Sequence, residues 1–217
     1  MQSLVTDPIY ENYLAALIAG DRAVCTAIVQ ELNNADIILK DLYLNLFQRS
    51  LYQVGELWEH HRISVSVEHL ATAITERLLT TVEPQAFRGQ FREHSVIIAC
   101  VADEYHQLGA RMVADFFEFH GWRGYFLGAN TPVKDLLDLI DKRNPDLLAL
   151  SLSIYSNLPS LLKALDAVRA EYPDLPILVG GQAFRWGGTG SLKKYSDVTY
   201  ISSIDVLEQK LEEYGDR

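Results

Sequence analysis

The first part of the chain carries apolar residues three and four positions apart, the spacing that places side chains on one face of a helix. This pattern predicts helices over about 10–19, 21 to at least 32, 37–59 and 64–82. Gly20 is expected to end the first helix, and Asp21 and Ser64 are the expected N-caps of the second and fourth. Four helices with short connections predict a small antiparallel bundle.

One end of this bundle carries polar chemistry. The expected inner face of the fourth helix consists of Val67, Leu70, Ala71, Ile74 and Leu78. Glu68 and His69 then point away from it, toward solvent or a second domain, and Trp58 ends the third helix. Packing alone does not require a tryptophan, a carboxylate and an imidazole there.

After residue 95 the pattern changes to short apolar runs that alternate with amphipathic segments. Strands are expected over 96–101, 125–127, 147–151, 177–179 and 198–201, and Thr131 and Pro132 are expected to cap and open the helix after the second strand. Continuous apolar strands alternating with helices predict an α/β domain. Its expected fold is a Rossmann-like (flavodoxin-like) five-stranded parallel sheet covered on both faces.

The two patterns are separated by residues 84–94, which begin with a proline and have no clear period. The expected domains are therefore a four-helix bundle over 1–83, a linker over 84–94, and a sheet domain over 95–217. In parallel sheets, ligands bind at the carboxyl ends of the strands.

Three features follow the ends of predicted strands. His106 lies on the loop after the first strand, Ser151 ends the third, and Gly180-Gly181 follow the fourth. Glu104 can hold the His106 imidazole by its second ring nitrogen, as carboxylates do for metal-ligating histidines. The arrangement suggests a metal-centred cofactor held by one protein ligand. Taken singly, each feature is equally an ordinary loop histidine, a hydrogen-bonded hydroxyl or a glycine turn.

Composition narrows the functional classes. The 217 residues are 48% hydrophobic with a formal net charge of −10, which supports a buried core and does not favour direct contact with nucleic acid. The sequence shows neither a membrane-spanning stretch nor a signal peptide at the N-terminus, so the expected location is the cytoplasm. Cys25 and Cys100 are expected to be buried free thiols.

These residues resemble cobalamin (vitamin B12)-binding modules, which pair a methionine-synthase-type helical cap with a Rossmann-like cobalamin domain. The family pattern D-x-H-x-x-G, S-x-L and G-G reads here Glu104-x-His106-x-x-Gly109, Ser151-Leu152-Ser153 and Gly180-Gly181. Glu104 replaces the usual aspartate, and Ser153 stands where leucine is usual.

The resemblance implies that the cofactor's own dimethylbenzimidazole base is detached and that His106 is the lower axial ligand of cobalt. The detached tail would then run past Gly109, Ser151 and the Gly-Gly turn. The implied cofactor-binding residues of the sheet domain are Glu104, Tyr105, His106, Gln107, Leu108, Gly109, Ser151, Ser153, Tyr155, Gly180, Gly181, Tyr200 and Ser202.

A narrower resemblance concerns the helical part. Trp58, followed after nine residues by Glu68-His69, is similar to the light-sensing cobalamin regulators, the MerR-type carotenoid photoreceptors and related short antirepressors. It implies that Trp58, Glu68 and His69 cover the upper cobalamin face, where a 5′-deoxyadenosyl group sits. The MerR-type DNA-binding domain of the larger members is not found in this sequence. Glu59 stands where some members place a histidine that captures cobalt, and His60 and His61 are out of register.

Three hypotheses follow. In the first, the protein is a non-enzymatic sensor that binds adenosylcobalamin, with methylcobalamin or hydroxocobalamin as other forms. It responds to light by changing contacts with a protein partner, such as a transcription factor, or with other copies of itself. In the second, it is a corrinoid carrier that moves methyl groups between methyltransferases. The third, a domain of a mutase-like enzyme, is least favoured because the sequence shows no substrate-binding barrel.

Overall fold

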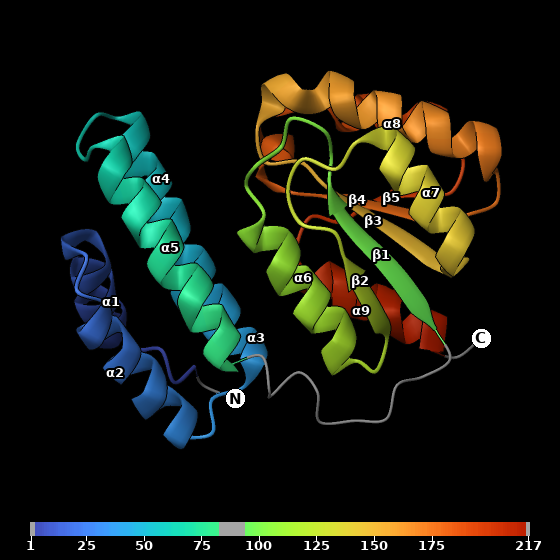
Figure 1. Ribbon diagram of the computed structural model, residues 1–217. Helices are drawn as coiled ribbons and strands as arrows, with labels where there is room; N and C mark the ends of the chain where they lie inside the picture. The colour runs from blue at the N-terminus through green and yellow to red at the C-terminus, as the bar shows by residue number, and fades with distance from the viewer. Residues whose placement is uncertain (1–2, 83–93, 216–217) are drawn as a thin grey trace. The chain divides into compact units, whose positions relative to one another are not determined.

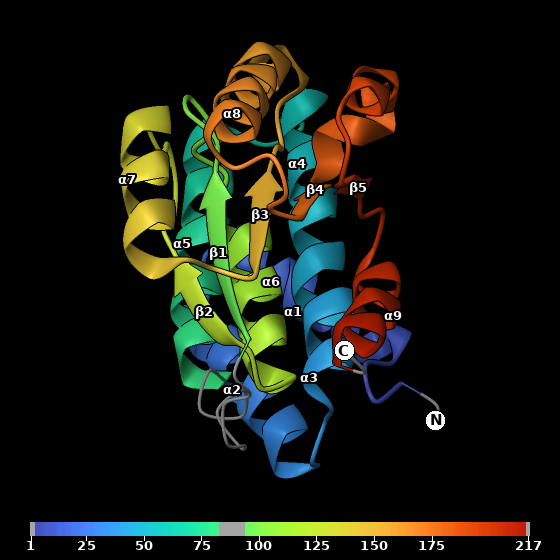
Figure 2. The ribbon, with the colours of Figure 1, turned by 90° about the vertical axis from the view of Figure 1, so that its right-hand side faces the viewer.

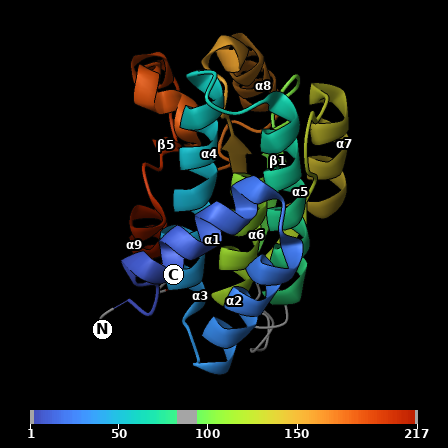
Figure 3. The ribbon, with the colours of Figure 1, turned by 90° about the vertical axis from the view of Figure 1, so that its left-hand side faces the viewer.

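The computed structural model describes residues 3–82 and 94–215 and divides the chain into two compact units, Met1–Arg88 and Gly89–Arg217. Apart from residue 94, the linker predicted over 84–94 lies outside the described residues. Figures 1 and 3 show the helical unit, Figure 3 from the side of α1 and α2, and Figure 2 shows the strands of the second unit.

The first unit is helical, as the sequence pattern predicts. Its elements are α1 (Asp7–Ala19), α2 (Arg22–Asn34), α3 (Leu39–Asp41), the π-helical η1 (Leu42–Gln48), α4 (Arg49–Glu59) and α5 (Val65–Val82). The segments α3, η1 and α4 follow one another directly and form the predicted long third helix. Gly20 ends α1 in a left-handed conformation with φ of 73°. The Asp21 carboxylate accepts a hydrogen bond from Val24 N (3.1 Å), and Ser64 Oγ accepts one from Val67 N (3.4 Å), which confirms both predicted caps.

The inner face of α5 differs from the prediction. Its buried residues are Ala71, Ile74, Thr75, Leu78, Leu79 and Val82, whereas Leu70 is 47% exposed. Ala71, Ile74 and Leu78 are buried as predicted, and the helix is rotated so that Thr75 enters the core beside Ala71. Leu70 instead reaches the end of α1, where its side chain lies against Gly20. The rotation also brings Glu68 into the row that continues through the buried Ala71 and Thr75, so Glu68 does not point fully away from the core as expected.

The second unit contains the predicted five-stranded parallel sheet. Its strands are β1 (Ser95–Cys100), β2 (Arg123–Phe126), β3 (Leu147–Ser151), β4 (Ile177–Gly180) and β5 (Val198–Tyr200), in the spatial order β2-β1-β3-β4-β5. Every pairing is parallel, and the arrowheads of β1, β2 and β3 point the same way in Figure 2. The sheet is flavodoxin-like in its strand order.

Helices cover both faces of this sheet, as continuous apolar strands require. α7 (Val133–Arg143) and α8 (Leu158–Glu171) pack on one face, and α6 (Leu108–Phe119) and α9 (Ile204–Gly215) pack on the other (Figure 1). Three short 3₁₀ segments, η3 (Tyr155–Asn157), η4 (Gln182–Trp186) and η5 (Thr189–Lys194), lie in the loops after β3 and β4.

One predicted helix start is wrong. α7 begins at Val133 with Pro132, not Thr131, in the N-cap position, and no side chain caps it. The backbone N–H of Thr131 donates to Cys100 O (3.1 Å), which holds this residue in the loop beside β1. Its hydroxyl is buried without a hydrogen-bond partner among the described residues.

Two further expectations can be compared with the structure. Cys25 and Cys100 are free and buried, as predicted. Within 3–82 and 94–215, none of the helices combines the length and the apolar character that a membrane crossing needs.

Gly181 is the glycine on which the sheet unit depends most directly. It has a φ of 114°, and a Cβ at this position would lie 2.1 Å from Leu152 O. We expect Gly181→Ala to lower the free energy of unfolding by about 3 kcal/mol or more, because both the strained φ and the clash must be relieved. Urea denaturation of the full chain measures the change.

Gly109 provides the matched control. It lies in the first turn of α6, and no atom of another residue comes within 4 Å of its Cβ position. Gly109→Ala should leave the stability unchanged or raise it slightly. Equal destabilisation by the two substitutions would show that the close approach of Gly181 to Leu152 is not what holds this turn.

Candidate functional site

The candidate site lies at the carboxyl ends of β1 and β3. The chain leads from β1 to β2 on one side of this pair of strands, and from β3 to β4 on the other side. The loops that follow β1 and β3 therefore diverge. In open parallel sheets such a switch point is where ligands bind. The loop after β1 carries Glu104 and His106, and the loop after β3 carries Ser153 and η3.

A buried carboxylate joins the two loops. Glu104 has no exposed surface, and its Oε1 accepts hydrogen bonds from His106 N (3.0 Å) and His106 Nδ1 (2.6 Å). Its Oε2 accepts from Ser153 N (2.9 Å) and Ile154 N (2.8 Å). One side chain therefore sets the orientation of the imidazole and fixes its loop to the loop after β3.

These hydrogen bonds also set the charge of Glu104. Burial by itself raises the pKa of a carboxyl group, because it removes water from the charged form. Here the bonds from His106, Ile154 and Ser153 outweigh burial and lower the pKa of Glu104 to about 2. The group is therefore a carboxylate at neutral pH.

His106 has the geometry of a ligand held from behind. Its side chain is 54% exposed, and Nδ1 is the nitrogen bound to Glu104. A metal ion would accordingly be ligated through Nε2, and the carboxylate would fix the tautomer. Within the described part of the chain, no cluster of three or more His, Cys, Asp or Glu residues could hold a metal ion.

The other predicted residues surround this pair in different ways. Tyr105 is exposed, Leu108 is buried at the start of α6, and Gly109 leaves open space beside its backbone. Gln107 lies between Tyr105 and Leu108, and its Oε1 approaches Gly128. The loop after β1 therefore keeps the space beside Gly109 clear.

The remaining predicted residues follow the next strands. Ser151 ends β3 in register with Cys100, and Tyr155 in η3 is exposed. Gly180 pairs with Ser151, and the next residue, Gly181, packs on Leu152. Tyr200 ends β5, where its ring lies 4.9 Å from the ring of Phe184, and Ser202 is exposed in the loop beyond it.

Four polar residues that hold the histidine loop were not predicted from the sequence. Asp103 N donates to Asn130 Oδ1 (2.8 Å), Asn157 Nδ2 donates to Asp103 O (3.0 Å), and Ser160 Oγ donates to Asp103 Oδ2 (3.2 Å). Asp103 and Asn130 have φ values of 67° and 49°. Asp and Asn adopt this left-handed conformation more readily than other side chains, so their positions soon after strands are a usable signal.

Cys100 lies under the same loop but is not poised to react. Its Sγ is 3.8 Å from His106 O, and burial together with the nearby Glu104 charge raises the pKa of the thiol to about 12. The thiol is therefore protonated at neutral pH, and a protonated thiol is a poor nucleophile and metal ligand.

The helical unit holds the other predicted residues near the turn between α4 and α5. Trp58 is 46% exposed, and His69 Nε2 lies 3.6 Å from Glu68 Oε2. Thr72 Oγ1 donates to Glu68 Oε1 (3.0 Å), which orients the carboxylate along α5. The large apolar side chains of Val65 and Leu70 are exposed on the same two turns of α5.

Comparison with known proteins identifies the family. Two family models, each described as a B12 binding domain, match residues 94–201 and 9–83. The chain belongs to the B12-binding proteins. This membership supports cobalamin as its ligand, as the resemblance implies, and the match over 94–201 contains both loops of the candidate site.

Two curated B12-family relatives are transcriptional repressors of Myxococcus xanthus. The HTH-type transcriptional repressor CarH is 30% identical over 176 residues, which cover 81% of this chain and 58% of CarH. The HTH-type transcriptional repressor CarA is 31% identical over 126 residues, covering 57% of this chain and 43% of CarA. The chain thus spans about half the length of the curated relatives it matches.

A solved structure shows the same fold at low identity. The monomethylamine corrinoid protein of Methanosarcina barkeri superposes with a TM-score of 0.82 and 15% sequence identity, covering 94% of this chain and 98% of that one. This B12-binding chain therefore has the corrinoid-protein fold, a helical region followed by a Rossmann-like domain.

The low pKa of Glu104 predicts acid sensitivity with a definite sign. Since the pKa falls from its usual 4.5 to about 2 on folding, the carboxylate stabilises the protein above pH 4.5, and this contribution is lost as the pH falls toward 2. We expect it to amount to about 3 kcal/mol. Denaturation across this pH range should show a steep loss of stability in the wild type and a shallower one in Glu104→Gln.

Glu104→Gln should also be less stable at neutral pH. The NH₂ group of an amide accepts no hydrogen bonds, so the backbone or ring N–H groups that face it would lose their acceptor. The exposed Glu212 offers the control, and Glu212→Gln should keep the wild-type pH profile. A wild-type profile for Glu104→Gln would mean that the carboxylate does not hold the two loops together.

Proposed function

We propose that this B12-binding chain is a sensor that binds adenosylcobalamin and reports light to a protein partner. The observation that carries the proposal is the group at the α4–α5 turn, where Trp58 is exposed and His69 lies 3.6 Å from Glu68. This is the pattern that resembles the light-sensing cobalamin regulators. The relation to two transcriptional repressors supports a regulatory role.

In this proposal the sheet unit holds the cofactor from below. The fit rests on His106, whose Nδ1 is bound to the buried Glu104 carboxylate so that Nε2 is the nitrogen for cobalt. The open space beside Gly109 would admit the detached tail, and Ser151, Ser153 and the Gly180-Gly181 turn would line its path. Tyr105, Gln107, Leu108, Tyr155, Tyr200 and Ser202 are proposed as further contacts.

The helical unit would cover the upper face. The bound cofactor would supply a cobalt–carbon bond that visible light breaks. Trp58 offers an exposed aromatic surface for the adenosyl group, while Glu68 and His69 offer an acceptor and a donor for its hydroxyl and amine groups. Because these contacts exist with the adenosyl group and not without it, they can bias the protein between two states.

The proposed output of the sensor is a change in its contacts with other proteins. The chain would act without catalysing a reaction, in the cytoplasm, through a partner such as a transcription factor and without touching nucleic acid itself. Its surface supports this last point, because a formal charge of −10 opposes binding to phosphates. A change in self-association is the other proposed output.

Light should change both the spectrum and the protein. We expect the full chain loaded with adenosylcobalamin in the dark to lose its dark spectrum under green light. Its elution volume, or the hydrogen exchange of the α4–α5 turn, should change at the same time. Free adenosylcobalamin is the spectral control, and chain loaded with hydroxocobalamin in the dark should match the illuminated sample.

The two readouts separate the hypotheses. A dark spectrum that survives strong light contradicts the photoreceptor proposal. A spectral change with no change in elution or hydrogen exchange contradicts the signalling step and favours the methyl-carrier alternative. In that case the methylcobalamin-loaded chain should donate its methyl group to a thiol in the presence of a methyltransferase.

His106→Ala tests the lower ligand. We expect this variant to bind adenosylcobalamin about tenfold more weakly or worse, and to lose the absorbance signature of imidazole-ligated cobalt, because it lacks the imidazole that Glu104 orients. His94→Ala serves as the control, since His94 stacks on Trp122 just before the start of β1. An unchanged spectrum in His106→Ala would show that the ligand assignment is wrong.

A further inference from the structure

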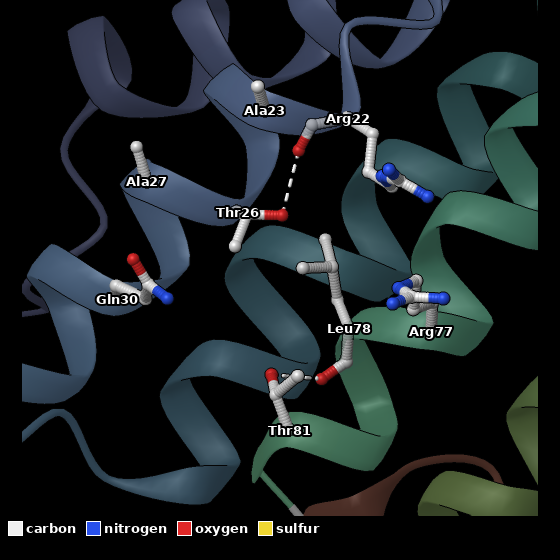
Figure 4. A pocket seen from close by; sticks show the side chains of 8 residues that line it. All are labelled: Arg22, Ala23, Thr26, Ala27, Gln30, Arg77, Leu78 and Thr81. Carbon is white, nitrogen blue, oxygen red and sulfur yellow. Dashed lines mark hydrogen bonds between the residues drawn. The ribbon is translucent and has the colours of Figure 1, made fainter.

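A pocket of about 480 Å³ lies between α2 and α5 within the helical unit. Figure 4 shows Arg22 from α2 and Arg77 from α5 toward the same end of this pocket, and Gln30 toward the other. Ala23, Ala27 and Leu78 form its apolar lining. None of the residues that line the pocket is acidic, so it concentrates positive charge on a chain with a formal charge of −10.

The two arginines contrast with several others whose guanidinium groups are bound within the chain. Arg49 pairs with Asp7 (3.2 Å), Arg111 pairs with Asp115 (3.1 Å), and Arg169 donates to backbone carbonyls. Among residues 3–82 and 94–215, neither Arg22 nor Arg77 has an ion-pair or hydrogen-bond partner for its guanidinium group. Two like charges that line one pocket repel each other, and a bound carboxylate would relieve this repulsion.

The hydroxyl groups of the pocket reinforce its preference for an acceptor. Thr26 Oγ1 donates to Arg22 O (2.8 Å), and Thr81 Oγ1 donates to Leu78 O (2.7 Å), as Figure 4 shows. With these protons committed, the donors left for a ligand are the two guanidinium groups and the Gln30 amide. The pocket therefore matches an anionic ligand that accepts hydrogen bonds.

The shape of the pocket matches a peptide segment better than a single small ion. From Arg22 to Gln30 the α2 surface extends about 12 Å, which is the length of three to four residues of extended chain. The methyl groups of Ala23 and Ala27 let another backbone approach α2 closely. Ala23 and Ala27 are themselves exposed and give apolar surface that an inorganic anion does not use.

We propose that this pocket is the docking site for an acidic segment of a protein partner. Carboxylates of the segment would bind Arg22 and Arg77, and a neighbouring apolar side chain would cover Ala23 and Ala27. The chemistry of the site rests on the pocket alone. The inference that the partner receives a signal rests on the proposed regulatory function.

Fluorescence anisotropy with the full chain tests the proposal. The probe is a fluorescein-labelled peptide built from glutamate and leucine, compared with the same peptide carrying glutamine in place of glutamate. We expect saturable binding of the acidic peptide that weakens with added salt and is absent for the glutamine peptide. Arg22→Ala combined with Arg77→Ala should reduce the affinity about tenfold. Arg123→Ala, which removes an exposed charge in the sheet unit, should not change it.

Cobalamin binding measured on the same variants keeps the two proposals apart. The double variant should bind adenosylcobalamin as the wild type does, so failure of peptide docking leaves the cofactor proposal standing. Equal peptide affinity in the wild type and the double variant would overturn the docking proposal. So would saturable binding of inorganic phosphate at Arg22 and Arg77 without peptide binding, which would indicate a small-anion site. A loss of self-association in the double variant, measured by sedimentation, would replace the partner with a second copy of the chain.

Discussion

The site depends on one buried carboxylate. Glu104 accepts four short N–H hydrogen bonds, two from His106 and one each from Ser153 and Ile154, and a longer one from Asn157 Nδ2 (3.5 Å). It has no surface in water. A charged group at such a position is tolerated only when its hydrogen bonds replace hydration. The parallel order of β1 and β3 supplies those donors, because it places the loop after each strand at the same edge of the sheet. The orientation of the histidine is thus a consequence of the sheet topology.

The choice of glutamate matters to this arrangement. Related cobalamin modules usually carry aspartate at this position, and an aspartate side chain is shorter by one methylene. In this chain the longer side chain reaches both the imidazole and the two backbone N–H groups after β3. An aspartate could make all four bonds only if one of the loops moved. The length of the glutamate side chain therefore matches the separation of the two loops. The hydrogen bonds that it makes to both loops also lower its pKa.

Much of the fold could be predicted from the sequence, because continuous apolar strands and helical stripes reflect burial directly. The Glu104–His106 pair could be found for the same reason, since it follows an unmistakable strand. The partners of Glu104 on the β3 loop could not be found, because backbone N–H groups of Ser153 and Ile154 leave no residue signature. The rotation of α5 was also missed. Leu70 and Ala71 were both expected on the inner face, and only Ala71 is buried there, because the close packing of α5 on its neighbours favours the smaller side chain.

The two units contribute differently to the proposed switch. The Glu104 clamp forms entirely within the sheet unit, and its bonds to His106 are present without any cofactor. A ligand shifts an equilibrium only through contacts that differ between the two states. In the proposal this difference would come from Trp58, Glu68 and His69, the exposed or partly exposed side chains proposed to meet the upper group. In the proposed sensor, binding by His106 would set how well the cofactor is retained, while the α4–α5 turn would set what the sensor can report.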